Sequence, residues 1–153
     1  MKAIQIKSLL KSTDELEVTT LPDLEASEDH YVVQVQAAGT NFFDALQVQG
    51  KHQNKPPLPF IAGNEFAGVV LKLPTRSGAH AFNVGDRVFG GELGAFATQI
   101  YVKHTDMRKI PKSWTALEAS GVFLTAPTAY CALAYRAAAR HGKFFVSASI
   151  VFR

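Results

Sequence analysis

The chain has one cysteine, Cys131, and it has neither a long apolar run nor a dense block of charge. A single cysteine excludes an internal disulfide and any zinc site built from several cysteines of this sequence. The neighbours of Cys131, among them Tyr130 and Leu133, are largely apolar, and they predict a buried structural thiol. The chemistry of this protein therefore has to come from other residue types.

Long hydrophobic segments are also missing. No apolar run approaches the roughly 20 residues that are needed to span a bilayer. The first 20 residues contain six charged side chains, which leave no apolar core for a secretory signal: Lys2, Lys7, Lys11, Asp14, Glu15 and Glu17. We expect a soluble cytoplasmic protein that does not bind membranes.

The chain also lacks a large excess of positive or negative residues. The net charge is +3, from 16 Lys and Arg against 13 Asp and Glu, and no five consecutive residues are basic. This distribution does not indicate a nucleic-acid partner. With 47% hydrophobic and 19% charged residues over 153 positions, the composition is that of a single packed domain.

The first three quarters of the chain read as short antiparallel strands. In residues 31–38, Tyr31, Val33 and Val35 alternate with Gln34 and Gln36, which is the period of a half-buried strand. Further strands are expected over residues 3–7, 16–20, 66–73, 86–89 and 96–102. Many short strands of this kind predict a barrel or a sandwich.

The last quarter changes to helix and then to one buried strand. Thr115 and Glu118 form a capping-box pattern, and the sequence at 125–127, with Pro127, reads as the start of a second helix over residues 126–140, ended by His141-Gly142. Residues 144–152 are apolar and uncharged, as in a parallel strand that is buried on both faces. We therefore divide the chain into a domain of residues 1–125 and a helix-and-strand segment of residues 126–153.

Several ordered motifs together resemble a known superfamily. They are Ala37–Asp44, Pro59–Val70, Val84–Val88, Gly94–Ala97, Lys109–Pro111 and Leu124–Tyr130. In this order they resemble the medium-chain dehydrogenase/reductases, over roughly residues 1–146. The resemblance implies a mainly β fold with flanking α-helices: a GroES-like, partly open β-barrel, followed by the first strand of a Rossmann domain that is otherwise absent.

Two asparagines distinguish branches within this superfamily. Asn41 and Asn64 stand where the zinc alcohol dehydrogenases have a cysteine and a histidine that bind catalytic zinc. Asparagine is a poor zinc ligand, and only Glu65 remains at a matching position. The chain is thus similar to the zinc-independent quinone oxidoreductases, which implies no metal site.

This resemblance implies the activity and the site. The family reduces quinones or α,β-unsaturated carbonyls with NADPH, so that the expected partner is a small quinone or enone. By resemblance, Asn41 lies near the nicotinamide or the acceptor, Thr128 contacts the cofactor, and Asp44 braces the start of a helix. Homodimers are common in the family, so a homodimer is one arrangement for this chain.

Two further residues are left with open roles. Some relatives have tyrosines at the positions of Leu46 and His52. His52 can donate a hydrogen bond and titrates near neutral pH, so it is either a catalytic acid or donor, or a surface residue without a role. Glu65 is either structural, satisfied by the backbone or by Arg87, or catalytic.

The family pattern stops before its nucleotide loop. Gly142 is the last glycine, so the glycine-rich turn that would cradle a pyrophosphate is missing from this sequence. Two hypotheses follow: the catalytic N-terminal domain of an oxidoreductase, inactive as an isolated chain, or a stand-alone barrel that binds a small molecule or a protein without catalysis.

Overall fold

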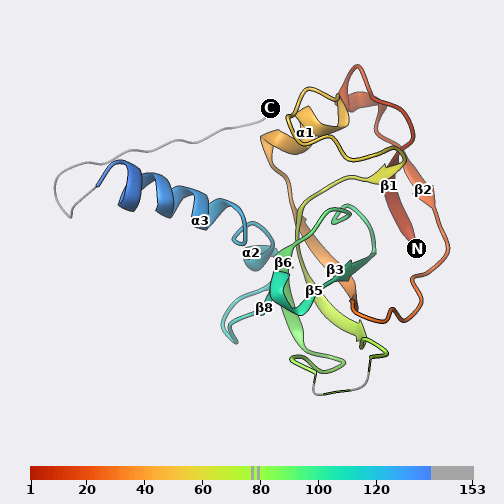
Figure 1. The fold of residues 1–153 in the computed structure, drawn as a ribbon, viewed down its shortest axis with the longest axis vertical. Coiled ribbons are helices and arrows are strands. Elements are labelled where there is room, and N and C mark those ends of the chain that lie inside the picture. Colours follow the sequence, from red (N-terminus) through yellow and green to blue (C-terminus); the bar gives the residue numbers. More distant parts are fainter. Residues whose placement is uncertain (77, 79, 139–153) are drawn as a thin grey trace.

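The computed structural model describes residues 1–76, 78 and 80–138, in which eight strands form two antiparallel sheets (Figure 1). The strands are β1 (Lys2–Ile6), β2 (Val18–Thr20), β3 (Tyr31–Gly39), β4 (Phe60–Ile61), β5 (Glu65–Lys72), β6 (Arg87–Gly91), β7 (Gln99–Val102) and β8 (Met107–Lys109). The helical segments are η1 (Thr13–Glu15), α1 (Phe42–Val48), η2 (His104–Asp106), α2 (Ala116–Ser120), α3 (Thr125–Tyr130) and the π-helical η3 (Cys131–Arg136).

The larger sheet has the order β7-β3-β5-β6-β8, with β5 at its centre. Strand β3 pairs with β5 from Val32–Lys72 to Gly39–Glu65, and β6 pairs with β5 on the other side. The main core packs on this sheet, where the side chains of Phe66, Val88 and Met107 are fully buried. Each such side chain stabilises the fold by roughly 1.5–3 kcal/mol relative to an exposed one.

The smaller sheet, β2-β1-β4, adjoins the segment that leads into β7, where Ala3 forms an isolated bridge with Ala97 and the Ile4 N–H donates to the Phe96 carbonyl. Its core contains Ile6 and Phe60 together with Val48 of α1, so this sheet holds the helix in place. The two sheets do not close into a full barrel within the described residues. The predicted fold class, a mainly β, partly open barrel with flanking helices, is confirmed.

Helix α2 begins where the capping box predicts. The Thr115 hydroxyl accepts from the Glu118 N–H at 3.2 Å, and the Glu118 carboxylate accepts from the Thr115 N–H at 2.7 Å. Each side chain thereby satisfies an N–H that has no partner within the helix. The helix then packs across β3 and β5, where Ala119 is fully buried.

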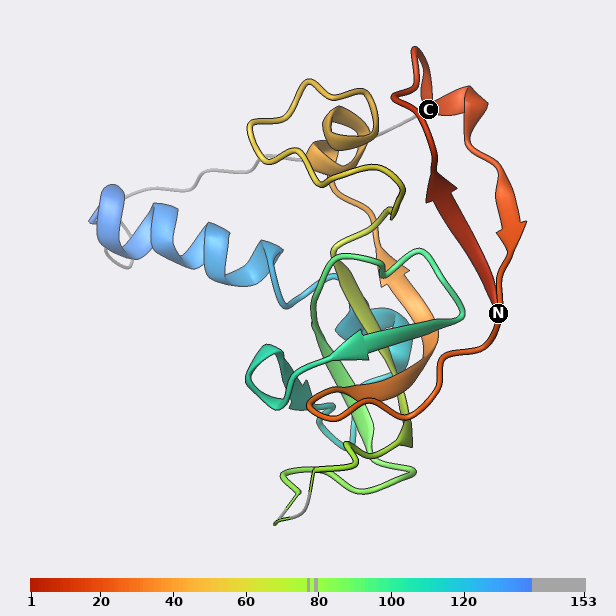
Figure 2. The same cartoon turned by 45° about the vertical axis from the view of Figure 1, so that its right-hand side comes forward.

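Helix α3 and η3 extend away from both sheets, as Figure 2 shows. The predicted helix over 126–140 is wrong in its end, because helical geometry stops at Arg136. The Ala137 N–H donates five residues back to Ala132, and Ala138 has a φ of 45°, which an α-helix cannot continue. The predicted helix stop at 141–142 and the strand at 144–152 lie outside the described residues.

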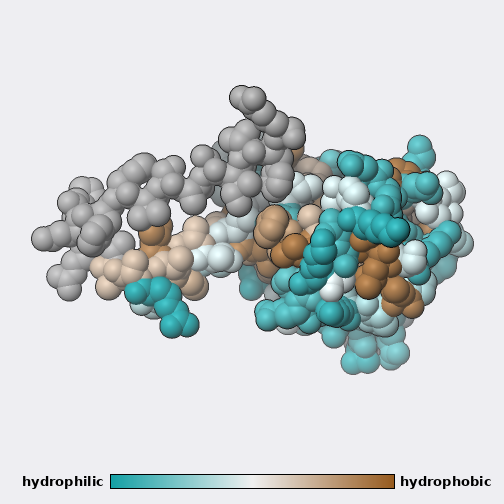
Figure 3. All heavy atoms as spheres, turned by 90° about the horizontal axis from the view of Figure 1, so that it is seen from above, coloured by the Kyte–Doolittle hydropathy of each residue, from teal (hydrophilic) through white to brown (hydrophobic). Residues whose placement is uncertain are grey.

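The projecting helix carries apolar residues into solvent. Figure 3 shows mainly hydrophobic residues along it, and Tyr130 and Tyr135 are 63% and 75% exposed. Cys131 is exposed too, so the predicted buried thiol is wrong. The apolar neighbours that suggested burial lie on a helix that does not pack on the sheets. No helix in the described part of the chain is long and apolar enough to cross a bilayer.

Four short elements were not expected from the sequence. They are the two-residue β4, the three-residue β8 and the 3-10 helices η1 and η2. Strand β8 contains Arg108 and Lys109, which have no strand pattern of their own, and it forms because it pairs with β6. In short edge strands such as this one, pairing decides the structure more than propensity does.

Candidate active site

The site begins at the turn between β3 and α1. Asn41 is the N-cap of α1, and its N–H donates to Asp44 Oδ2 at 2.7 Å, while the Asp44 N–H donates to the Asn41 carbonyl at 3.0 Å. A carboxylate in the first turn also interacts favourably with the helix dipole. The expectation that Asp44 braces the helix start is confirmed.

Two side-chain amides lie against two buried carboxylates here. Asn41 Nδ2 donates to Glu65 Oε1 at 2.8 Å, and Asn64 Nδ2 donates to Asp44 Oδ1 at 2.8 Å and to Gln47 Oε1 at 3.2 Å. Glu65 is 1% exposed and Asp44 is 5% exposed. These contacts join α1 to the start of β5 through polar groups that would be costly to bury alone.

Burial determines the acidity of Asp44. Desolvation raises the pKa of the Asp44 carboxyl above its ordinary value, and the nearby Glu65 carboxylate acts in the same direction. Hydrogen bonds from Asn64 and from the Asn41 N–H oppose this shift only in part. Gln47 Nε2 is buried without a hydrogen-bond partner in the described structure. Asp44 and Gln47 are therefore polar side chains in a tightly enclosed part of the site.

A continuous set of hydrogen bonds connects Asn41 with the start of α3. Glu65 Oε2 accepts from the Leu124 N–H at 3.0 Å, and the Leu124 carbonyl accepts from the Thr128 hydroxyl at 2.7 Å. The predicted site residues Asn41 and Thr128 are thus three hydrogen bonds apart. Of the two partners expected for Glu65, the backbone is the one found, because the Arg87 guanidinium donates instead to the Trp114 carbonyl.

His52 lies at the other end of α1. Its N–H and that of Lys51 donate to the Leu46 carbonyl, and its ring packs on Phe43 with 5.6 Å between ring centres. His52 Nδ1 lies 3.2 Å from the Asn54 nitrogen and 3.4 Å from the Asn54 carbonyl oxygen, so it accepts from the N–H in one tautomer and donates to the carbonyl in the other. No hydrogen bond of the described residues joins His52 to Asn41, and the two possible roles of His52 remain open.

Asn41 borders a pocket of about 300 Å³ between α1, the segment of residues 13–16, and the loop residues Ala62 and Phe96. Its walls are mainly apolar and include Leu16, Val48 and Phe96, with Asn41, Asp44, Thr13 and Thr40 as the polar members. An apolar pocket with a few convergent polar groups is typical of a small-molecule site. Neither His52 nor Thr128 lines this pocket.

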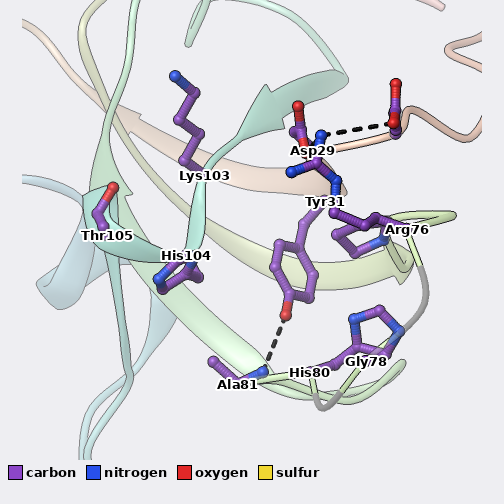
Figure 4. A pocket seen from close by; sticks show the side chains of 11 residues that line it. Asp29, Tyr31, Arg76, Gly78, His80, Ala81, Lys103, His104 and Thr105 are labelled. Carbon is purple, nitrogen blue, oxygen red and sulfur yellow. Dashed lines mark hydrogen bonds and ion pairs between the residues drawn. The ribbon is translucent and has the colours of Figure 1, made fainter.

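A second pocket, of about 470 Å³, lies at the far end of the larger sheet (Figure 4). The Tyr31 hydroxyl accepts from the Ala81 N–H there, at 3.0 Å, and Arg76 pairs with Asp29 at 2.9 Å. His80, Lys103 and His104 complete its polar wall. None of the predicted site residues is part of it.

Metal-binding groups are sparse in the described structure. Within residues 1–76, 78 and 80–138, no three His, Cys, Asp or Glu side chains lie close enough together to hold a metal ion. Two amides occupy positions beside the buried carboxylates, and the amide nitrogens donate toward them. Such nitrogens have no lone pair to offer a cation.

The roles of Asn64 and Gln47 were missed in the sequence. The motifs point to Asn64 only as an unsuitable zinc ligand, and they do not point to Gln47. A signal was present, because Asn41, Asp44 and Gln47 are spaced by three residues and so share one face of a helix. A polar stripe on a short helix beside a buried Glu65 points to a hydrogen-bonded cluster.

Comparison with known proteins identifies the class. The alcohol dehydrogenase GroES-like domain model matches residues 27–112, which is more than half of the chain. The chain belongs to this family. The quinone oxidoreductase-like protein 2 homolog of Nematostella vectensis is 34% identical over 113 residues, which are 72% of this chain and 30% of that protein.

Solved structures agree with the family. The quinone oxidoreductase of Pseudomonas syringae has a TM-score of 0.78 at 28% identity, over 88% of this chain and 41% of that one. The Escherichia coli quinone oxidoreductase in complex with NADPH has a TM-score of 0.80 at 25% identity, over 89% and 41%. The chain is a quinone oxidoreductase-like member of the medium-chain dehydrogenase/reductases, as the sequence motifs indicated, and it spans about 30% of the length of the curated relative.

Proposed function

We propose that this chain is the N-terminal catalytic domain of an NADPH-dependent, zinc-independent reductase of quinones or α,β-unsaturated carbonyls. The observation that carries the proposal is the position of Asn41. Asn41 borders an apolar pocket, and its amide is held by a buried carboxylate that also reaches the start of α3. A small uncharged acceptor fits such a pocket better than a charged one does.

The chemistry requires a hydrogen-bond donor near the acceptor oxygen. The nicotinamide supplies a hydride when bound, and negative charge then develops on the oxygen of the quinone or enone. Asn41 Nδ2 carries a second N–H, which makes no hydrogen bond within the described residues, and it can donate to that oxygen. In this proposal Thr128 contacts the cofactor, and the His52 imidazole is a further donor.

The donor set of the site supports chemistry without zinc. A catalytic zinc needs about three thiolate, imidazole or carboxylate ligands. Here the amide nitrogens of Asn41 and Asn64 face the carboxylates of Glu65 and Asp44, so these acids are already engaged by neutral donors. A zinc ion at this place would have to break at least two of these hydrogen bonds.

We propose further that the 153-residue chain does not turn over alone. Hydride transfer requires the two reacting atoms to be held about 3–3.5 Å apart, and the family's glycine-rich nucleotide loop is not in this sequence. A homodimer is compatible with the proposal, as is binding of NADPH in preference to NADH. A barrel that binds a small molecule without catalysis is the competing outcome of the test.

The test follows NADPH binding to the ¹⁵N-labelled chain by NMR, with calorimetric titrations of NADPH, NADH and zinc alongside. We expect NADPH to shift the signals of Asn41 and Thr128, zinc to cause no saturable heat, and NADPH oxidation with a 1,4-quinone to be absent. Asn41→Ala should abolish the shift at Thr128. The matched control Asn83→Ala, an exposed turn residue, should leave it intact.

Shifts confined to other surfaces, or none at millimolar NADPH, would refute the assignment of this site. They would favour the non-catalytic barrel. Measurable NADPH oxidation by the pure chain would instead refute the expected inactivity while keeping the site.

A further inference from the structure

Glu65 is the most enclosed acidic residue of the described chain. It is 1% exposed, and its two oxygens accept from different parts of the fold: Oε1 from Asn41 Nδ2 at 2.8 Å, and Oε2 from the Leu124 N–H at 3.0 Å. Hydrogen bonds to a carboxylate are stronger than those between neutral groups. One side chain therefore links the start of α1 to the segment that leads into α3.

The space around the Glu65 side chain in the sheet is narrow. Its cross-strand neighbours on both sides are glycines, Gly39 on β3 and Gly91 on β6. A Cβ at Gly39 would lie 2.9 Å from Glu65 Oε1 and 2.7 Å from the Ser120 carbonyl, and a Cβ at Gly91 would lie 2.7 Å from the Phe123 ring. Glycine at these two places lets the chain of residues 120–124 approach the Glu65 carboxylate.

We propose that Glu65 is a positioning residue: its carboxylate sets the orientation of the Asn41 amide and, in the same arrangement, the start of α3. This inference rests on the proposed function, since Asn41 and Thr128 matter as residues of the cofactor cleft. Glu65 also influences the position of Thr128. It holds Leu124, and the Thr128 hydroxyl donates to the carbonyl of Leu124.

The orientation of the amide depends on the fact that a carboxylate only accepts. An asparagine amide can rotate by half a turn and exchange its oxygen with its nitrogen. Beside Glu65 only the nitrogen forms a hydrogen bond, so Asn41 Oδ1 is excluded from this contact and remains for other partners. Glu65 thereby decides which atoms of Asn41 are left for a ligand.

Glu65→Gln separates this role from a merely structural one. Glutamine has one oxygen, and the Leu124 N–H can only donate, so we expect the new side chain to keep its oxygen toward Leu124 and to direct its amide nitrogen toward Asn41. Two amide nitrogens cannot share a hydrogen bond, and the Asn41 amide should therefore rotate. The variant conserves the shape of the side chain at position 65 and changes which atom of the Asn41 amide faces it.

The experiment measures ¹⁵N NMR spectra of the 153-residue chain without ligand. In Glu65→Gln we expect the side-chain NH₂ signals of Asn41 to shift. The amide nitrogen of the introduced glutamine should then donate to Asn41 Oδ1. The N–H signal of Leu124 should shift less. Asp44→Asn is the matched control, since Asp44 is the other buried acid of the cluster. It should shift the Asn64 side chain and leave Leu124 unchanged. A lower melting temperature with an unrotated Asn41 amide would overturn the proposal.

A pH titration of the wild type covers the case in which the variant does not fold. The Asn41 side chain and the Leu124 N–H should shift together with the Glu65 carboxyl carbon, and the Asn64 side chain should follow Asp44. If Asn41 and Leu124 do not follow Glu65, the proposal is wrong. NADPH is added to the same samples in a final step. If the Asn41 amide rotates in Glu65→Gln but the wild type shows no response to NADPH, the positioning role stands and the proposed function is refuted.

Discussion

Gly63 determines how Asn64 and Glu65 enter the site. It has a φ of 89°, a conformation that residues with a Cβ rarely adopt, and its carbonyl accepts from the N–H groups of Gly94 and Ala95. A Cβ at this position would lie 2.4 Å from the ring of Phe96 and 2.7 Å from its backbone nitrogen. Both the backbone angle and the available space therefore require glycine.

Gly63→Ala should be strongly destabilising, and Gly85→Ala is its matched control. Gly85 has the same φ of 89°, but nothing lies within 4 Å of a Cβ built there. We expect Gly63→Ala to lower the free energy of unfolding by about 1–3 kcal/mol more than Gly85→Ala does, because only the first variant overpacks the core. Urea denaturation measures both. Equal losses would show that backbone strain alone explains the glycine.

Among the elements, α2 is the one whose sequence and structure agree most closely. Thr115 and Glu118 satisfy each other's N–H groups, and the backbone hydrogen bond from Thr115 keeps the pKa of the Glu118 carboxyl below its ordinary value. A lowered pKa means that this contact contributes stability above the ordinary value of 4.5 and that the contribution is lost as the pH falls through the folded-state pKa.

Thr115→Ala tests this element. Losing the cap should lower Tm by about 2–4 °C at neutral pH, and the acid-induced fall in Tm below pH 4.5 should become shallower, because Glu118 loses a partner of its charged form. Ser113→Ala, an exposed residue two positions earlier, is the control and should leave both quantities unchanged. Thermal denaturation followed by circular dichroism gives the two values. An unchanged pH profile in Thr115→Ala would contradict the capping role.

At the scale of the whole molecule, stability is uneven. The five-stranded sheet contains most of the fully buried side chains, whereas Tyr130 and Tyr135 on the projecting helical segment are 63% and 75% exposed. Regions with few buried apolar contacts open at lower free energy than the core does. The helix that carries Thr128 is thus attached to the sheets mainly at its start, where Leu124 meets Glu65.

Hydrogen exchange should reveal this division. We expect amides of β3 and β5 to exchange at the rate of global unfolding, and those of α3 and η3 to exchange at least tenfold faster. Mass spectrometry of peptic fragments measures the rates, and the amides of β6 serve as the internal control. Slow exchange throughout residues 125–136 would mean that the helix is covered in solution, by a second copy or by another surface.

Much of the fold was predictable because it depends on local patterns. Alternation over residues 31–35 predicts β3, the Thr115–Glu118 spacing predicts the start of α2, and the ordered motifs indicate the family. The assignment of Asn41 and Thr128 to the site, made by resemblance, stays a prediction. It did not predict β8, the exposure of Cys131 or the end of the helix at Arg136, since these depend on which surfaces meet.

The amino-acid sequence alone was thus enough to indicate the class of protein and the main strands, because periodicity, caps and motif order are local properties of the chain. The pairing of the polar residues depends on the tertiary structure. Glu65 meets Asn41 and Leu124, which are 24 and 59 residues away, because two flanking glycines let the backbone approach the buried carboxylate. Such long-range hydrogen bonds leave no periodic pattern in the sequence, since burial and close packing select them.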